Sequence, residues 1–280
     1  MTPHHTGILF ISISAIVWST LGLFAKGIDA DVWIILFWRG LFAILILGLY
    51  AYQKSDKGIT QEIKNLGWPG WASAVIGAAA TVCFISAFKY TSIANVSIIY
   101  ATIPFIVSVL AWLFLKEAIS AIVIGCSSLA LLGVFIMLGG SLGSINIIGD
   151  TLALSMALGM SALVVLFRKF PKRPMILSTI LAALINILIS AILSNPLDIN
   201  SFDLLALVLF GILFAIATIL TIEGTRLIPA SQSAIISTLE VPLAVLLAWL
   251  VFAHIPSTVT WIGGGLVLIA IALNMRFQNS

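Results

Sequence analysis

Two ionisable residues stand inside long apolar segments of this sequence. Arg39 lies about two turns into one segment, and Glu240 lies about twelve residues into another. A charge buried in a membrane costs several kcal/mol unless water or a partner stabilises it. The pattern therefore favours a polar cavity in which Arg39 binds a carboxylate or phosphate, while Glu240 binds an amine or carries a proton. The alternative is structural: the two residues pair with each other or cap helix backbone.

No group of residues in the sequence is typical of an enzyme. The three histidines, His4, His5 and His254, have no carboxylate at a spacing that suits catalysis. The Gly-rich stretch 139–143 precedes no lysine of a phosphate-binding loop, so it is interpreted as part of a linker. We therefore expect no catalytic residue, no metal site and no cofactor.

The composition is that of a chain surrounded by a lipid bilayer. Of the 280 residues, 61% are hydrophobic and 8% are charged, whereas soluble domains have about 45–50% and about 25%. So few charged residues cannot cover the core of a soluble protein of this size. This excludes a soluble enzyme, a nucleic-acid-binding protein and a disordered chain. The net charge of +3 then indicates basic cytoplasmic loops rather than a nucleic-acid partner.

Long apolar runs separated by polar breaks predict an all-α integral membrane protein with ten transmembrane helices. A helix that crosses a bilayer needs about 20 apolar residues. The runs are apolar on every face, which excludes the alternating pattern of a β-barrel. The predicted spans cover residues 7–27, 33–52, 69–88, 93–114, 119–138, 150–168, 174–194, 203–224, 229–252 and 257–275.

The distribution of Lys and Arg predicts the orientation of the chain. Of the 13 basic residues, ten fall in loops on the side of the N-terminus, Lys26 and Lys89 fall in loops on the other side, and Arg39 lies within a span. Basic loops are retained in the cytoplasm. Both termini are therefore expected to be cytoplasmic, which requires an even number of spans.

The second half of the chain repeats features of the first at an offset of 136 to 138 residues. The matching pieces are Ala94–Ile99 with Ala230–Ile235, Pro104 with Pro242, and Ala111–Leu113 with Ala248–Leu250. Each half holds five spans, an odd number, so the second half must enter the membrane inverted. Inverted repeats are typical of alternating-access transporters. The predicted units are a first repeat at 1–140, a linker at 141–149 and a second repeat at 150–280.

Other residues inside the spans are candidates for lining a cavity or for hinges in the helices around it. Pro104 and Pro242 each free a backbone carbonyl and are predicted as hinges or kinks, with a passive bend as the alternative. The aromatic candidates for the cavity wall are Trp18, Trp38 and Tyr100. The alternative for these rings is packing against lipid or in the core. The polar candidates, which either line the cavity or bond across helices, are Ser19, Asn186 and Ser237.

Several of these pieces resemble the drug/metabolite transporter superfamily, in its ten-helix EamA-type branch of metabolite exporters. The resemblance covers nearly the whole chain and rests on Trp18-Ser19, Arg39, the run from Ala94 to Glu117 and the run from Ala230 to Leu250. It implies a carrier of the bacterial inner membrane, a monomer or homodimer, with a central cavity lined by spans one to four and six to nine. The fifth and tenth spans would be peripheral.

The sequence departs from the family pattern after the ninth span. Ala253-His254 stands where the family usually has Gly-Glu, so Glu117 has no counterpart in the second half. This departure leaves open whether Glu117 has a structural role.

Together these features predict a secondary transporter that moves a small polar or amphipathic metabolite, an amino acid or derivative, by alternating access. Arg39 and Glu240 suit the two ends of a zwitterion, and export is the expected direction. No ATP-binding motif is present, so the expected driving force is a proton, ion or substrate gradient. The alternative is a multidrug exporter with a mainly apolar cavity, in which Arg39 is structural.

Overall fold

The computed structural model describes residues 2–55, 58–91, 93–138, 146–252 and 258–277. Regular structure within these residues is entirely helical. The helices are α1 (Pro3–Gly27), α2 (Val32–Lys54), α3 (Ile59–Tyr90), α4 (Ile93–Tyr100), α5 (Ile103–Leu115), α6 (Ala121–Leu138), α7 (Ile147–Lys169), α8 (Met175–Leu193), α9 (Ser201–Thr225), α10 (Ala230–Ser237), α11 (Glu240–Phe252) and α12 (Thr258–Phe277). Most of the predicted linker, and His254, lie outside the described residues, and α7 begins at Ile147 within the last part of that linker.

The helices form ten membrane crossings. Nine segments of the described chain are long and apolar enough to cross a bilayer, and the shorter apolar segment Ala121–Met137 in α6 is the tenth. The predicted ten-helix fold is therefore confirmed. The predicted spans 93–114 and 229–252 each consist of two helices, because α4 with α5 and α10 with α11 each form one crossing that is interrupted in the middle.

Tight turns interrupt these two crossings. In the first, the N–H of Thr102 bonds to the carbonyl of Ile99, three residues back, instead of four. In the second, the N–H of Leu239 bonds to the carbonyl of Ile236 in the same way. A bond to the third preceding residue tightens the last turn of a helix. Each crossing therefore consists of two half-helices that meet inside the protein.

The third crossing starts where the sequence indicates. Gly67 has φ of 59° and ψ of −174°, so the helical path of α3 is broken there. A positive φ is readily adopted by glycine and costs other residues energy. Pro69 stands at the start of the helix that follows, where its missing N–H is tolerated. The residues of α3 before Gly67 therefore form a separate short segment ahead of the crossing.

The two halves of the chain run in opposite directions through the molecule. The imidazole of His4, at the start of α1, contacts Gln232 in α10. Arg168, at the end of α7, donates to the carbonyl of Arg226, just before α10. The first helix of one repeat therefore begins at the end of the molecule where the first helix of the other finishes. This arrangement is the inverted repeat that the sequence predicts.

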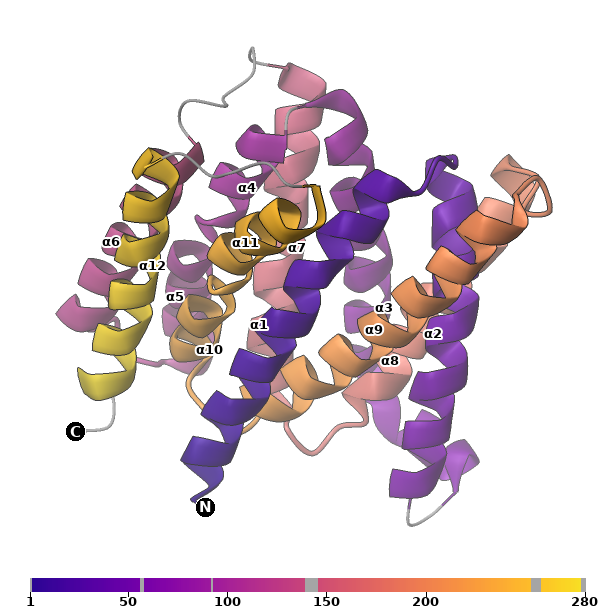
Figure 1. The fold of residues 1–280 in the computed structure, drawn as a ribbon. Coiled ribbons are helices and arrows are strands. Elements are labelled where there is room, and N and C mark those ends of the chain that lie inside the picture. Colours follow the sequence, from indigo (N-terminus) through magenta and orange to yellow (C-terminus); the bar gives the residue numbers. More distant parts are fainter. Residues whose placement is uncertain (1, 56–57, 92, 139–145, 253–257, 278–280) are drawn as a thin grey trace.

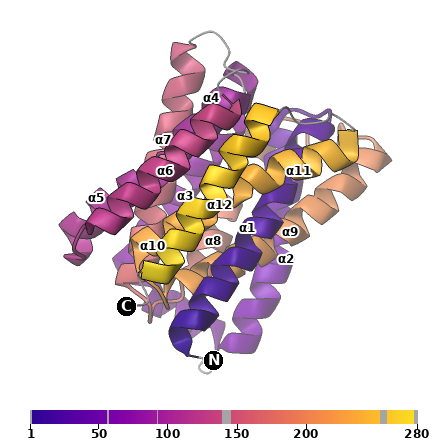
Figure 2. The same ribbon diagram turned by 60° about the vertical axis from the view of Figure 1, so that its left-hand side comes forward.

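Packing between the repeats follows the same symmetry. Helix α1 packs on α9 as its counterpart α7 packs on α3, and α2 packs on α9 as α8 packs on α3. Helix α2 packs against its own counterpart α8, and α6 packs against α12. Figure 1 shows α6 and α12 side by side at the left edge of the bundle, and Figure 2 shows them side by side in front of the other helices. Figure 1 also shows both termini at the same end.

The α6–α12 contact is close because it uses glycine. A Cβ atom added to Gly133 in α6 would lie 2.6 Å from the carbonyl oxygen of Gly263 in α12, too near for a real contact. Small residues let helix backbones approach in this way inside a membrane. The contact holds the two peripheral helices together and leaves the other crossings to surround the centre.

Candidate functional site

A central cavity of about 160 Å³ lies between the two repeats. Its wall includes residues from α1, α2, α3, α4 and α5 of the first repeat and from α7, α8, α9, α10 and α11 of the second. Among the described residues, none from α6 or α12 lines it. This is the distribution that the family resemblance implies for a central cavity with peripheral fifth and tenth spans.

Arg39 lines this cavity from α2 as a buried cation. Its side chain is only 5% exposed, and its Cζ atom lies 4.3 Å from the ring centre of Phe214 and 5.4 Å from that of Phe210. A guanidinium over an aromatic face gains a cation–π interaction. Within the described residues, no carboxylate forms an ion pair with Arg39, and its Nε atom has no hydrogen-bond partner. The cation is therefore available to an anionic group in the cavity.

Glu240 lines the cavity from the opposite repeat and is bonded to Tyr100. The Tyr100 hydroxyl donates to Glu240 Oε2 at 2.8 Å. Tyr100 is the last residue of α4 and Glu240 is the first residue of α11, so the bond joins the two interrupted crossings at their breaks. Among the described residues, no ion pair joins Glu240 to Arg39, which was the structural alternative for these two residues.

Trp18 forms part of the aromatic wall beside Arg39. Its ring meets the ring of Phe214 edge to face, with centroids 5.5 Å apart. Its Nε1 donates to the Thr221 hydroxyl at 3.2 Å, and Thr221 in turn donates to the carbonyl of Ala217. The polar atom of the indole is thus satisfied within the protein. The ring surface is left to contact whatever occupies the cavity.

Asn186 and Ser237 also line the cavity. Asn186 is 3% exposed, and its Nδ2 donates a long, 3.5 Å bond to the carbonyl of Ala78, while its Oδ1 has no partner among the described residues. Ser237 donates to the carbonyl of Ser233 in its own helix at 2.9 Å. Among the described residues, Asn186 Oδ1 is therefore a buried acceptor without a partner on a residue of the cavity wall, whereas the Ser237 proton is already used.

Trp38 and Ser19 do not line the cavity, although a neighbour of each does. Trp38 precedes Arg39, and Ser19 follows Trp18. Successive residues on a helix point about 100° apart, so Trp38 turns away when its neighbour Arg39 faces inward. Its Nε1 donates to the carbonyl of Pro196 at 2.7 Å, and its ring stacks on Phe42. Ser19 is 2% exposed and donates to the carbonyl of Ile16. The structure places both outside the group formed by the other site candidates.

The prolines that the sequence predicts as hinges directly follow the two helix breaks. Pro104 is the second residue of α5, and Pro242 is the third residue of α11. In the first turn of a helix, the missing N–H of proline leaves no donor unpaired. Neither proline lines the cavity. Their role as hinges stays a prediction, and their position defines where the second half of each crossing starts.

Several cavity residues carry no charge and were not predicted from the sequence. On α9 they are Phe214, Thr218 and Thr221, and on α3 they are Ser73, Gly77, Thr81 and Phe84. Within each helix they recur at three or four residues and so share one face. A stripe of small or hydroxyl residues with helical spacing was the available signal. Such stripes also occur where helices simply pack together.

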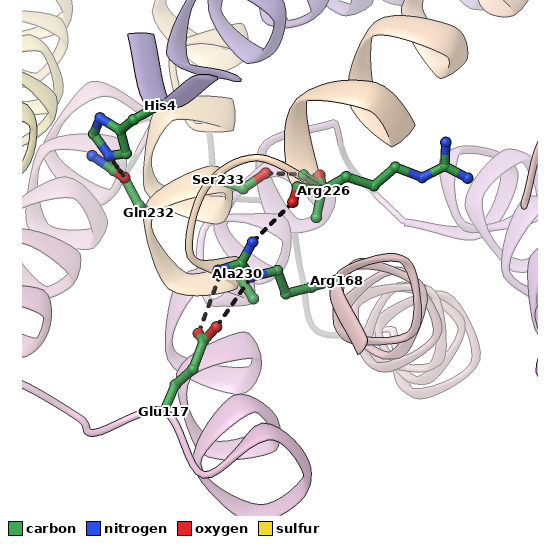
Figure 3. Close-up of polar contacts among 8 residues, drawn as sticks. His4, Glu117, Arg168, Arg226, Ala230, Gln232 and Ser233 are labelled. Carbon is green, nitrogen blue, oxygen red and sulfur yellow. Dashed lines mark hydrogen bonds and ion pairs between the residues drawn. The ribbon is translucent and has the colours of Figure 1, made fainter. Parts of the chain in front are cut away.

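A polar cluster lies at the end of the molecule that carries both termini, and Figure 3 shows its contacts. Glu117 Oε1 accepts from Arg168 Nε at 3.3 Å, and its Oε2 accepts from the backbone N–H of Ala230 at 3.3 Å. Arg168 Nη1 donates to the carbonyl of Arg226 at 2.9 Å. These contacts tie together the ends of α5, α7 and α9 and the start of α10. Glu117, without a counterpart in the second half, therefore has a structural role in the first.

Two further contacts extend this cluster, as Figure 3 shows. The hydroxyls of Thr225 and Ser233 lie 3.0 Å apart, and both residues are buried. His4 Nε2 and Gln232 Oε1 also lie 3.0 Å apart, which links the start of α1 to α10. The cluster therefore includes contacts from both repeats on this side of the central cavity.

Known proteins resemble the chain at the level of family and fold. The model of the EamA-like transporter family matches residues 5–139 and, a second time, residues 147–276. A solved structure titled only "Crystal structure of protein" is similar with a TM-score of 0.82 and 20% sequence identity, over 98% of both chains. An identity this low shows a shared fold alone. No curated protein matches the chain.

Proposed function

The chain belongs to the EamA-like transporter family, and from this premise we propose that it is a secondary transporter of a small amphipathic metabolite. An amino acid or a derivative is the proposed substrate, alternating access is the mechanism, and export is the direction. The family match makes the protein a multi-pass membrane transporter. The substrate and the direction are proposed from the cavity and the charge distribution.

The observation that carries the substrate class is the buried cation of Arg39 in the central cavity, which pairs with no carboxylate among the described residues. A cation held away from water without a carboxylate partner is costly, and an anionic ligand offsets that cost. The neighbouring rings of Trp18 and Phe214 suit the apolar part of the same molecule. Glu240, on the opposite repeat, supplies a negative group for an amine. The combination favours a zwitterion over a simple anion or a hydrocarbon.

We further propose that Glu240 couples transport to protonation or to the charge of the substrate. Its position at a helix break lets a relative movement of the repeats change its surroundings. A carboxyl group can accept a bond from Tyr100 in both protonation states, but the bond to the ionised form is stronger. Binding of the substrate in the cavity and protonation of Glu240 would then favour different positions of the half-helices that meet at the break.

The proposed location is the bacterial inner membrane with both termini in the cytoplasm. The ten-to-two distribution of loop Lys and Arg supports this orientation. It places the Glu117 cluster on the cytoplasmic side. A reporter fused after Ser280 should be active only if the C-terminus is cytoplasmic, and a periplasmic signal would overturn the orientation.

Transport of labelled compounds into proteoliposomes tests the proposed function. The panel should include amino acids with apolar side chains, the matching decarboxylated amines and the matching deaminated acids. We expect transport of the zwitterions, and loss of either charged group should reduce it. Empty liposomes and protein with Arg39→Gln are the controls. Equal transport of the amines and acids would contradict a site for both charges.

Multidrug export is the alternative that a specific observation favours. Much of the cavity wall is apolar, with Leu36, Ile103, Leu163 and Phe167 among its residues. A hydrophobic cation would suit these side chains together with Glu240. In that case Arg39→Gln should leave transport of such cations intact, whereas amino acids should not be carried by either protein.

A further inference from the structure

A second cavity, of about 270 Å³, lies between the ends of α2 and α9 and the starts of α3 and α8. Its wall comes from four helix ends and the segment before α8. The lining residues are Tyr50, Ala51, Lys54, Ser55, Glu62, Pro171, Lys172, Arg173, Pro174, Ile176, Leu177, Glu223 and Arg226. None of the described residues lines both this cavity and the central one. It lies at the end of the molecule that carries both termini. We call it the basic pocket.

The described residues that line the basic pocket carry an excess of positive charge. Four are basic, namely Lys54, Lys172, Arg173 and Arg226, and two are acidic, namely Glu62 and Glu223. Glu223 is already neutralised twice, because its Oε1 lies 2.8 Å from Lys54 Nζ and 2.9 Å from Arg226 Nη1. The remaining charge of the wall is therefore positive.

Two polar atoms on this wall are buried and lack a partner among the described residues. They are Nε of Arg226 and Oγ of Ser55, which lie on different helix ends. An unsatisfied buried donor costs free energy that a ligand can recover. Both groups can donate to an oxygen atom. An anion with several acceptor oxygens would satisfy both.

The start of α8 adds a third source of positive potential. This 19-residue helix begins after Pro174 without a side-chain cap, and its first residues Ile176 and Leu177 line the pocket. The start of a helix carries a partial positive charge and often binds phosphate. Alone it would indicate little, but here it faces the same cavity as the basic side chains and the unpartnered donors.

We propose that the basic pocket binds a phosphate group. A phosphate presents several acceptor oxygens around one centre, so donors from α2, α8 and α9 can reach it together. The phosphate belongs either to an anionic lipid headgroup or to a small soluble ion, because the recognising chemistry is the same. Basic pockets between transmembrane helices are suited to lipid headgroups. This site is separate from the central cavity and independent of the transported substrate.

The test uses the full-length protein in neutral detergent and two substitutions that spare the structural contacts. Lys172→Gln removes a charge from the wall, and Ser55→Ala removes a hydroxyl that bonds to no described residue. The matched control is Lys64→Gln, which removes the same charge from an exposed position that does not line the pocket. Arg226 is left unchanged because it also donates to the carbonyl of Arg173.

The melting temperature is measured during titration with inorganic phosphate, against chloride at equal ionic strength. It is also measured with short-chain phosphatidylglycerol, against short-chain phosphatidylcholine. We expect a rise with phosphate or phosphatidylglycerol, and about five-fold weaker binding in Lys172→Gln, the value for one cationic contact. Ser55→Ala should weaken binding as well, and Lys64→Gln should bind as wild type does.

The two titrations identify the source of the phosphate. A response to phosphatidylglycerol at concentrations where inorganic phosphate has little effect supports a lipid headgroup. A response to inorganic phosphate, without preference for phosphatidylglycerol over phosphatidylcholine, supports a soluble ion. No response beyond chloride and phosphatidylcholine would overturn the proposal. Equal weakening by Lys64→Gln and Lys172→Gln would also overturn it, because the effect would then be one of overall charge.

Discussion

The hydroxyl of Tyr100 and the carboxyl group of Glu240 are hydrogen bonded at 2.8 Å across the boundary between the two repeats. Each residue stands at the break of an interrupted crossing, one at the end of α4 and the other at the start of α11. The offset between Pro104 and Pro242 aligns Glu240 with Thr102 and Tyr100 with Thr238. The two breaks are therefore related by the repeat but differ in chemistry. A movement of one repeat relative to the other at this level would strain or break the bond.

Removing the Tyr100 hydroxyl should weaken this contact between the repeats. Tyr100→Phe keeps the ring, and we expect the free energy of unfolding to fall by about 1.5–3 kcal/mol, the range for a hydrogen bond to a charged group. Thermal unfolding in detergent measures the change. Tyr52→Phe is the control, because Tyr52 is exposed and does not line the cavity. Equal melting temperatures for Tyr100→Phe and wild type would contradict a stabilising bond.

Replacing the Glu240 carboxyl group should separate folding from coupling. Glu240→Gln retains an oxygen that accepts from Tyr100, so we expect a melting temperature close to that of wild type. Transport should be lost or should no longer respond to a pH difference, because an amide does not titrate. Uptake by proteoliposomes at several internal and external pH values measures this. Full transport with the wild-type pH response would exclude the coupling role.

Much of the fold could be predicted because its signals are local in the sequence. Apolar runs of the length of a bilayer define the crossings, and the matched Pro104 and Pro242 reveal the repeat. Arg39 and Glu240 were noticeable because a charge is rare in such a run. The odd number of crossings in each half then required the inverted arrangement.

The remaining features depend on tertiary packing and leave weak signals. Trp38 and Arg39 are neighbours with similar depth, and only the rotation of α2 decides which faces the cavity. Phe214 and Thr218 are ordinary residues for an apolar helix, so nothing in the sequence distinguishes a cavity wall from a packing face. The bond from Tyr100 to Glu240 joins residues 140 positions apart. Its geometry results from two helix breaks that the sequence showed only as prolines.

Disrupting the Glu117 cluster should lower stability by a modest amount. The Glu117 and Arg168 side chains are 26% and 29% exposed, so solvent screens part of their attraction. Glu117→Gln should cost about 1 kcal/mol, from a partly exposed ion pair and the cap on α10. Thermal unfolding measures it, with Asp29→Asn, at an exposed loop position, as the control.

The double variant tests whether the two residues act as a pair. Glu117→Gln with Arg168→Gln should cost less than the sum of the single changes, because residues in direct contact are not additive. Additive costs, or a Glu117→Gln protein as stable as wild type, would show that the contact contributes little.

Arg39→Gln should have opposite effects on transport and on stability. The substitution removes a buried cation that has no carboxylate partner among the described residues. The contacts with Phe214 and Phe210 that it sacrifices are worth about 0.5–2 kcal/mol. Keeping an unpaired charge away from water costs several kcal/mol. We therefore expect Arg39→Gln to unfold at the wild-type temperature or above it.

The same variant should lose transport of zwitterions, because the substrate carboxylate has lost its cation. Melting temperature and uptake are measured on one preparation, so that a folding defect cannot pass for a binding defect. Arg39→Lys is the matched control: it keeps the charge without the planar donor pattern of the guanidinium, and it should retain weak transport. A strongly destabilised Arg39→Gln protein would instead assign Arg39 to the structure, and a stable one with full transport would remove it from the site.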